Sequence, residues 1–342
     1  MNKLQNIQAL RGIAVLCVVF FHLLFIESKY GGRETVLPGW LGFGMFGVDL
    51  FFVISGFVMA TVTRGKFQSL KQSLRFLYHR ISRIYPLYWV YTTLAFTVFL
   101  IIPSWVNSSQ GNQVNIPASY LLLPDNLLPL VQVGWTLIHE MYFYLVFFLL
   151  LLFLPERFLV TGIFLWGIVI TIFGSSTGNA YYNVVFHPLT WEFLAGCLLA
   201  VHYHNGKSVK ANGRILALIA AAGLTVSILG FASLGAQPER WMRLFYYGIP
   251  AVVIVFCLVH AERNEYILPR WLIQTGDASY SIYLSHLFTI NVVGRLWSLI
   301  AAAPVLDNII ALPVIFTFAL AAGFVSYQYI ETPLLKLTRR LA

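Results

Sequence analysis

Long apolar runs divide this sequence, and they constrain its fold more than any other feature. Ten runs are long enough to cross the hydrocarbon core of a bilayer, which takes about 20 residues in a helix. They cover residues 7–26, 41–62, 84–103, 135–154, 158–174, 184–202, 214–233, 244–261, 280–301 and 308–330. Only 10% of the 342 residues are charged, against about 25% in soluble domains. Since strand-like alternation is absent, we expect an all-α, polytopic membrane protein with one domain over residues 1–342.

The basic residues predict the orientation of these spans. With the N-terminus inside, the basic segments 63–83, 203–213 and the tail after residue 330 all face the cytoplasm, as the positive-inside rule requires. The basic residues that remain outside are Lys29, Arg33, Arg240, Arg243 and Arg295. We therefore expect both termini to be cytoplasmic. The net charge of +9 then reflects membrane topology and contact with membrane lipids, and no nucleic-acid partner is expected.

The longest outer segment, residues 104–134, is apolar in its second half but is interrupted by Pro124 and Pro129. Such a segment is too broken to span a membrane. We expect a re-entrant or interfacial piece that covers the outer side of the bundle.

Two ionisable residues, Arg11 and His22, lie in the first apolar run. Eleven residues separate them, so they project from one helix face within about 20° and stand roughly 16 Å apart along the axis. Ionisable groups inside a span usually face a protein interior or a water-filled cavity. The pair predicts a polar track, while a snorkelling arginine and a hydrogen-bonded packing histidine are the structural alternatives.

The second run contains GMFGVDLFFVISGF, with Asp49 near mid-membrane and Ser55 close behind it. A buried acid needs a partner, and by depth Arg11 is the nearest candidate. A catalytic role and a purely structural ion pair both remain open. The glycines of this run favour close helix packing.

Arg80 and Arg83 are three residues apart at the expected cytoplasmic surface, in YHRISRIYPLYW. Residues with this spacing are neighbours on a helix, and paired guanidinium groups suit phosphate oxygens. We favour a phosphate-bearing ligand here, with anionic lipid as the alternative.

Glu140 and His286 complete the set of candidates. Glu140 lies near the outer end of the fourth span, close to His22 in depth, where a carboxylate can orient an imidazole. A structural hydrogen bond is the alternative. His286 lies about one and a half turns from the inner end of the ninth span, at the depth of Arg11, and both a structural and a functional role stay open. The other histidines lack metal-ligand spacing, so no metal is expected.

These motifs together resemble the acyltransferase-3 family of bacterial membrane O-acyltransferases. The likeness rests on Arg11 and His22, GVDLFFVISGF, the Arg80–Arg83 pair followed by IYPLYW, WTL..E..FY around Glu140, and SYSIYLSH ending at His286. Some family members carry an added soluble domain. None follows the last span here, so we expect a stand-alone member of the exopolysaccharide type.

The resemblance implies a multi-pass protein of the bacterial inner membrane with acyl-CoA, expected to be acetyl-CoA, as the cytoplasmic donor. The acceptor is a hydroxyl of a cell-surface or exported glycan or of a lipid-linked saccharide. We assign His22, Arg11, Glu140 and Asp49 to catalysis, with His22 as general base or transient acyl carrier. We assign Arg80, Arg83, Ser55 and His286 to donor binding. A transporter or flippase of a lipid-linked sugar, and a structural role in glycan export, are the alternatives; the sequence predicts no oligomeric state.

Overall fold

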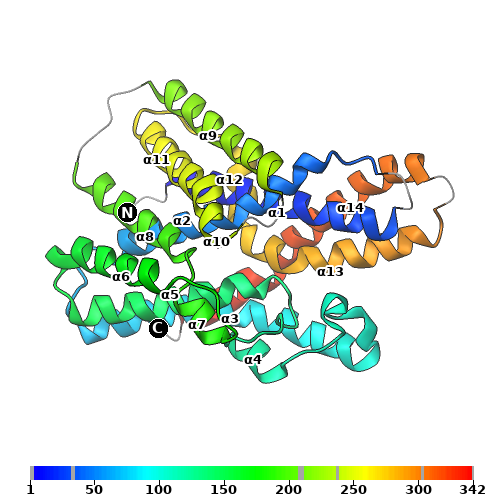
Figure 1. The fold of residues 1–342 in the computed structure, drawn as a ribbon, viewed down its shortest axis with the longest axis horizontal. Helices are drawn as coiled ribbons and strands as arrows, with labels where there is room; N and C mark the ends of the chain where they lie inside the picture. Colours follow the sequence, from blue (N-terminus) through cyan, green and yellow to red (C-terminus); the bar gives the residue numbers. More distant parts are fainter. Residues whose placement is uncertain (1–3, 32–34, 207–211, 236–238, 302–303, 341–342) are drawn as a thin grey trace. The chain divides into compact units, whose positions relative to one another are not determined.

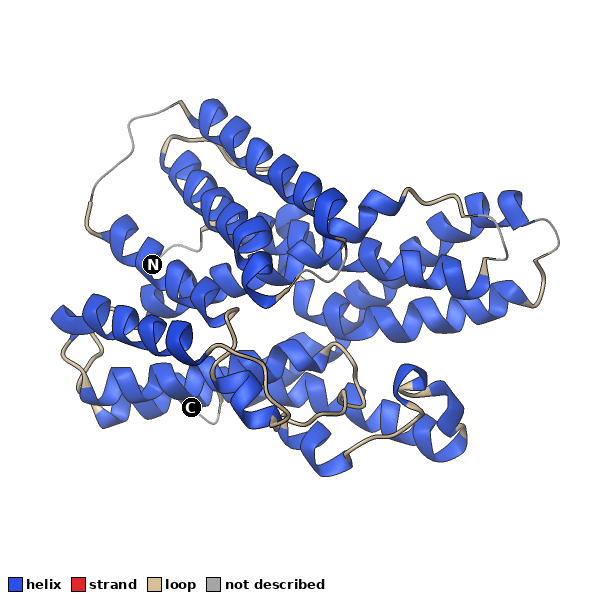
Figure 2. Ribbon diagram, in the orientation of Figure 1, coloured by secondary structure: helices blue, strands red, loops and turns tan. Residues whose placement is uncertain are grey.

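The computed structural model describes the whole chain except residues 1–3, 32–34, 207–211, 236–238, 302–303 and 341–342. Its described residues form helices joined by loops, with no β-strand among them (Figure 2). Lys207 and Lys210 of the predicted basic segment 203–213, and the predicted outer Arg33, lie outside the described residues. The all-α polytopic class is confirmed, and the cytoplasmic placement of both termini stays a prediction.

Nine helices in the described part of the chain are long and apolar enough to cross a membrane. They are Gln5–Tyr30, Gly39–Val62, Leu70–Ile101, Gly134–Phe153, Glu156–Phe173, Ala180–His204, Gly213–Ser233, Arg240–Arg263 and Val305–Thr338. Each matches one of the expected spans, because the length of an apolar run is a local property of the sequence. The remaining expected span, 280–301, forms a helix of 20 residues, α13 (Ser279–Ser298), which is not among those nine.

The chain divides into two compact units, one with residues 1–55 and 201–328, the other with residues 56–200 and 329–342. The helices of the first unit are α1 (Gln5–Tyr30), η1 (Gly39–Met45), the start of α2 (Phe46–Val62), α9 (Gly213–Leu234), α10 (Arg240–Arg243), the π-helix η5 (Leu244–Gly248), α11 (Ile249–Arg263), α12 (Arg270–Asp277), α13 and α14 (Pro304–Ser326). The helices of the second unit include α3 (Leu70–Ile101), α4 (Ile116–Leu121), α5 (Gly134–Phe153), α6 (Leu159–Phe173), α7 (Ala180–Val185), most of α8 (Thr190–His204) and α15 (Thr332–Arg339).

Helix α1 is the centre of the first unit, where it contacts η1, α11, α12, α13 and α14 (Figure 1). Glycines bring its neighbours unusually close. A Cβ atom added to Gly47 would lie 2.2 Å from the carbonyl oxygen of Ala14, and one added to Gly276 would lie 1.7 Å from that of Gln8. Only a residue without a side chain permits such backbone contact. The prediction of close packing by the second-run glycines is confirmed at Gly47, and α1 is fixed between α2 and α12.

Helix α12 was not predicted, because eight residues with mixed polar and apolar side chains resemble a loop in a hydropathy pattern. It lies along the first turns of α1, since Gly276 meets Gln8 and Gly12 meets the carbonyl of Leu272. Helix α13 follows after Ala278. Because α12 lies beside α1, α13 also begins beside α1. This starting point sets the position along α1 at which the polar side chains of α13 lie.

The long helix α3 organises the second unit, and it begins earlier than the expected span 84–103. Ser69 caps it by accepting a hydrogen bond from the Gln72 N–H. Its 32 residues extend about 48 Å, well over the ~30 Å of a bilayer core. The Gln68 N–H donates to the Leu151 carbonyl at 2.8 Å, so the start of α3 lies beside the end of α5.

The segment 104–134 folds back along α3 and contains the short helix α4 (Figure 1). Tyr88 donates to the Ser119 carbonyl at 2.7 Å and Trp89 donates to that of Tyr120 at 3.0 Å. Both donors lie in the middle of α3, so the segment reaches well inside the length of that helix. The aromatic residues of IYPLYW thus hold the segment against α3, and its re-entrant or interfacial placement in the membrane stays a prediction.

Candidate active site

His22 lies on α1 and is half-buried. Its Nδ1 atom is 2.8 Å from the Val18 carbonyl oxygen, one turn back on the same helix. The same Nδ1 atom is 3.2 Å from Nε2 of His286, and the two imidazole centroids are 4.9 Å apart. Two ionisable rings from helices far apart in sequence thus meet inside the first unit.

The position of His286 differs from the prediction, which put it at the depth of Arg11. Its ring is fully buried against His22, about 16 Å further along α1. The cause is α12, which occupies the level of Gln8 and Gly12 and displaces the start of α13 along α1. A depth that is estimated by counting residues from the ends of the spans does not account for this displacement.

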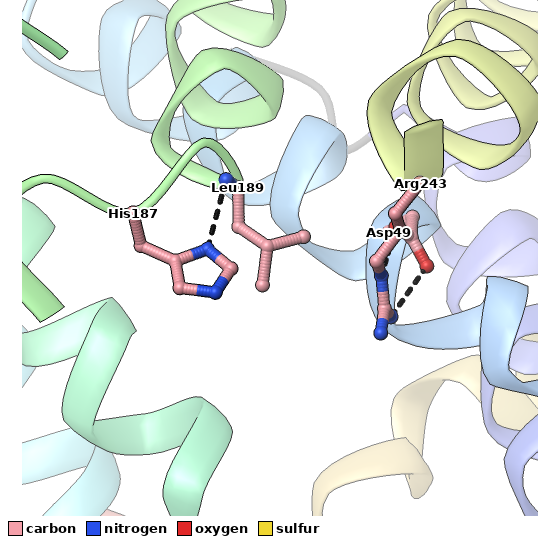
Figure 3. A network of polar contacts seen from close by, with 4 residues as sticks. All are labelled: Asp49, His187, Leu189 and Arg243. Carbon is pink, nitrogen blue, oxygen red and sulfur yellow. Dashed lines mark hydrogen bonds and ion pairs between the residues drawn. The ribbon is translucent and has the colours of Figure 1, made fainter. Parts of the chain in front are cut away.

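Asp49 on α2 is completely buried, and its partner is Arg243. Nε of Arg243 donates to Oδ1 and Nη2 donates to Oδ2, both at 2.8 Å (Figure 3). The predicted partner, Arg11, was therefore wrong. Arg243 was expected on the outer side, but it is buried at the end of α10, where the chain continues into the π-helix η5. This bidentate arrangement engages both oxygens of the Asp49 carboxylate.

Arg11 and Ser55 lie in the first unit on α1 and α2, and both are half-buried. Each takes part in non-covalent contacts within the protein. The catalytic role predicted for Arg11 and the donor-binding role predicted for Ser55 stay predictions.

A second polar cluster lies between α3 and α5 in the other unit. The Tyr144 hydroxyl donates to Oε1 of Glu140, and Arg80 lies close enough to interact electrostatically with both side chains. Tyr144 is buried. Arg80 therefore lies near an acid of the same unit. The orientation of His22 by Glu140, expected from depth, stays a prediction.

Arg80 lies within the long helix α3, and its placement at the cytoplasmic surface stays a prediction. It is ten residues beyond the start of α3 at Leu70, about 15 Å along the helix, and its guanidinium carbon is 5.8 Å from the centre of the Phe76 ring. Its Nε atom is buried and makes no hydrogen bond to any described residue. Arg83, one turn further, is half-buried and has no hydrogen bond or ion pair with the described residues. The two arginines thus differ in their surroundings: Arg80 lies near Glu140 and Tyr144, while Arg83 has no such acidic neighbour among the described residues.

A further imidazole pair was missed. His139 and His187 have ring centroids 4.9 Å apart, and Nδ1 of His187 accepts the Leu189 N–H at 3.1 Å (Figure 3). The His139–Glu140 dipeptide is the one sequence signal nearby, but nothing in the pattern links it to His187. In the part of the chain that the structure describes, no three His, Cys, Asp or Glu residues are placed to hold a metal ion.

Fold and site together define a class: a multi-pass helical membrane protein with titratable side chains paired deep within its helices, a placement typical of functional sites. A family model for an acyltransferase domain, acyltransferase-3, matches residues 4–328, and the chain belongs to this family. The expected family is confirmed.

Three individual proteins are similar to this chain over most of its length. The chain is 31% identical over 332 residues to the exopolysaccharide production protein ExoZ of Rhizobium meliloti, covering 92% of this chain and 95% of ExoZ. It is 28% identical over 310 residues to BcsY of Komagataeibacter xylinus, named as a membrane-bound transacylase, with 83% and 72% covered. It is 25% identical to the O-acetyltransferase OatA of Staphylococcus aureus, and spans 57% of that longer protein. No solved structure matches the chain.

Proposed function

We propose that this chain is an O-acyltransferase of the bacterial inner membrane that moves an acetyl group from cytoplasmic acetyl-CoA to a hydroxyl of an exported or cell-surface glycan. The observation that carries the proposal is the pattern of hydrogen bonds made by the His22 ring. Both of its hydrogen-bond contacts use Nδ1, so Nε2 is left to exchange a proton with substrate. The family match over residues 4–328 supplies the reaction class.

In the proposed step, the acceptor hydroxyl oxygen attacks the carbonyl carbon of the thioester. Nε2 of His22 takes the hydroxyl proton as the C–O bond forms. The C–S bond then breaks, and the departing CoA thiolate receives that proton and leaves as the free thiol. A positioned general base contributes about 10²–10⁴-fold to such a reaction. A transient acyl group on His22 remains an alternative route to the same products.

The phosphates of the donor are proposed to bind in the second unit. Arg83 offers a guanidinium group that no described residue uses, and forked N–H donors suit phosphate oxygens. Arg80 lies one turn away and interacts electrostatically with Glu140. We therefore propose that Arg83 contacts the CoA phosphates directly. Arg80, which lies beside Glu140, is proposed to take part in donor binding with less freedom to move. The residues present fit the phosphates of the donor.

The proposed acceptor rests on the names of two similar proteins. ExoZ is named for exopolysaccharide production and OatA as an O-acetyltransferase, so a polysaccharide or its lipid-linked precursor is the acceptor class that we favour. Arg11 is proposed to assist catalysis at His22, and Ser55 is proposed to contact the donor.

The experiment measures transfer of radiolabelled acetyl groups from acetyl-CoA into polymer. It uses membrane vesicles of the native host in which the chromosomal gene is deleted and variants are supplied on a plasmid. We expect His22→Ala to abolish transfer while the protein level is unchanged. Full activity of His22→Ala would refute the role of His22. If glycan crosses the vesicle membrane without consumption of acetyl-CoA, the chain is a transporter and the proposal fails.

A further inference from the structure

The hydrogen bonds around His286 locate its proton. Nδ1 of His286 is 2.7 Å from the Tyr283 carbonyl oxygen and 3.2 Å from that of Ile282. Carbonyl oxygens only accept hydrogen bonds, so Nδ1 carries the hydrogen in this position. In the neutral ring Nε2 then holds a lone pair, and this lone pair is directed at His22.

The same reasoning applies to His22. Its Nδ1 atom is 2.8 Å from the Val18 carbonyl, so Nδ1 is protonated there too. The single Nδ1–H of His22 is therefore shared between two acceptors, the Val18 carbonyl oxygen at 2.8 Å and the lone pair of His286 Nε2 at 3.2 Å. No other arrangement of protons in the neutral pair satisfies all of these contacts.

This arrangement decides where an added proton can go. A proton on Nε2 of His22 would leave the bond to His286 intact and strengthen it, since the donor would become charged. A proton on Nε2 of His286 would face the N–H of His22 and break the bond. The pair can thus accept one proton, at the nitrogen of His22 that is not bound within the protein.

The ring of His286 has little freedom to move. It is completely buried, and the adjacent Ile282 packs so closely on α14 that a Cβ on Gly323 would lie 2.4 Å from its side chain. Among the described residues, the titratable groups in contact with His286 are His22 of α1 and Tyr283 of its own helix. A completely buried ring presents no surface to the phosphates of CoA, which argues against the donor-binding role expected from the sequence.

The geometry points to His286 as the positioning residue of the general base: its Nε2 accepts the Nδ1–H of His22 and holds the reactive Nε2 of His22 in one tautomer and one orientation. The inference rests on the proposed function, because it assigns His286 a role in the same proton transfer. His286 itself does not touch the substrate.

The test compares His286→Leu with His286→Gln in the vesicle assay, with acetyl-CoA as the varied substrate. We expect His286→Leu to lower kcat about 10–100-fold, a part of the general-base contribution, with the KM for acetyl-CoA unchanged. Glutamine is expected to recover part of this loss, because its amide oxygen can accept the Nδ1–H. His260→Leu is the matched control, since His260 is also buried and its Nδ1 also contacts the carbonyl one turn back, at Phe256. Its kcat should stay at the wild-type value.

Two results would overturn the inference. One is a raised KM for acetyl-CoA at unchanged kcat in His286→Leu, which would make His286 a donor contact. The other is wild-type kcat in His286→Leu, because loss of the acceptor would then have no effect on proton transfer by His22. The proposed function fails separately, when His22→Ala alone stays active. If His22→Ala is inactive and His286→Leu is fully active, only the present inference is wrong.

Discussion

The carboxylate of Asp49 is bound edge to edge by the guanidinium group of Arg243, through two hydrogen bonds of 2.8 Å. This pair joins the start of α2 to the end of α10 inside the first unit. It connects residues 194 positions apart, both buried. Such a pair is costly to break, because removing one partner strands a charge away from water.

Single substitutions of the pair should therefore harm stability more than a double substitution. We expect Asp49→Leu or Arg243→Met to destabilise the protein by about 3–5 kcal/mol, and the double variant to recover most of that loss. Thermal unfolding in detergent checks this. The double variant also tests the predicted catalytic role of Asp49: wild-type kcat in this variant would show that the pair is structural.

Close backbone contact makes Gly47 and Gly276 sensitive to the smallest substitution. We expect Gly47→Ala and Gly276→Ala to cost about 1–3 kcal/mol, because the added Cβ would overlap a carbonyl oxygen of α1 in each case. The unfolding temperature in detergent is the readout. Gly39→Ala is the control, since a Cβ there meets nothing within 4 Å; equal losses at all three glycines would contradict the packing argument.

Arg83 and Arg80 should respond differently to removal. We expect Arg83→Ala to raise the KM for acetyl-CoA about 10-fold or more, the value of a charged hydrogen bond, without lowering kcat. With acetyl-pantetheine, which lacks the nucleotide phosphates, the same variant should behave like wild type. An equal loss with both donors would exclude a phosphate contact.

Arg80→Ala, in contrast, should lower the unfolding temperature, because it removes a cation that interacts electrostatically with the Glu140 carboxylate. The double change Arg80→Met with Glu140→Gln should restore stability. Arg75→Ala is the control for both arginines, since Arg75 lies on the same helix with an exposed side chain.

The start of α1 is capped from a distance by Glu262. Its Oε1 accepts the Gln5 N–H at 2.9 Å and its Oε2 accepts the Asn6 N–H at 2.8 Å. We expect Glu262→Ala to cost about 1–2 kcal/mol, the value of an N-cap, and to speed amide hydrogen exchange in the first turn of α1. Unchanged exchange at Gln5 and Asn6 would show that the cap is dispensable.

The spans were predictable because each depends on a local run of apolar residues. The helix of Arg11 and His22, the interrupted segment after residue 104, and the close packing at Gly47 follow from the same local information. The family motifs added the reaction class, since they occur in one order over nearly the whole chain.

The partners of the polar side chains were not predictable. Asp49 was expected to meet Arg11 and His286 was expected near Arg11, because both estimates counted residues from span ends and assumed parallel, uninterrupted helices. The short helix α12 displaces α13 along α1, and buried Arg243 lies where α10 passes into a π-helix. The sequence by itself determined the spans, the family and the residues able to carry charge or protons. Only the tertiary structure decided that His22 faces His286 and Asp49 faces Arg243, because a pairing depends on the axial offset between two helices, and that offset is set by side-chain packing far from either residue.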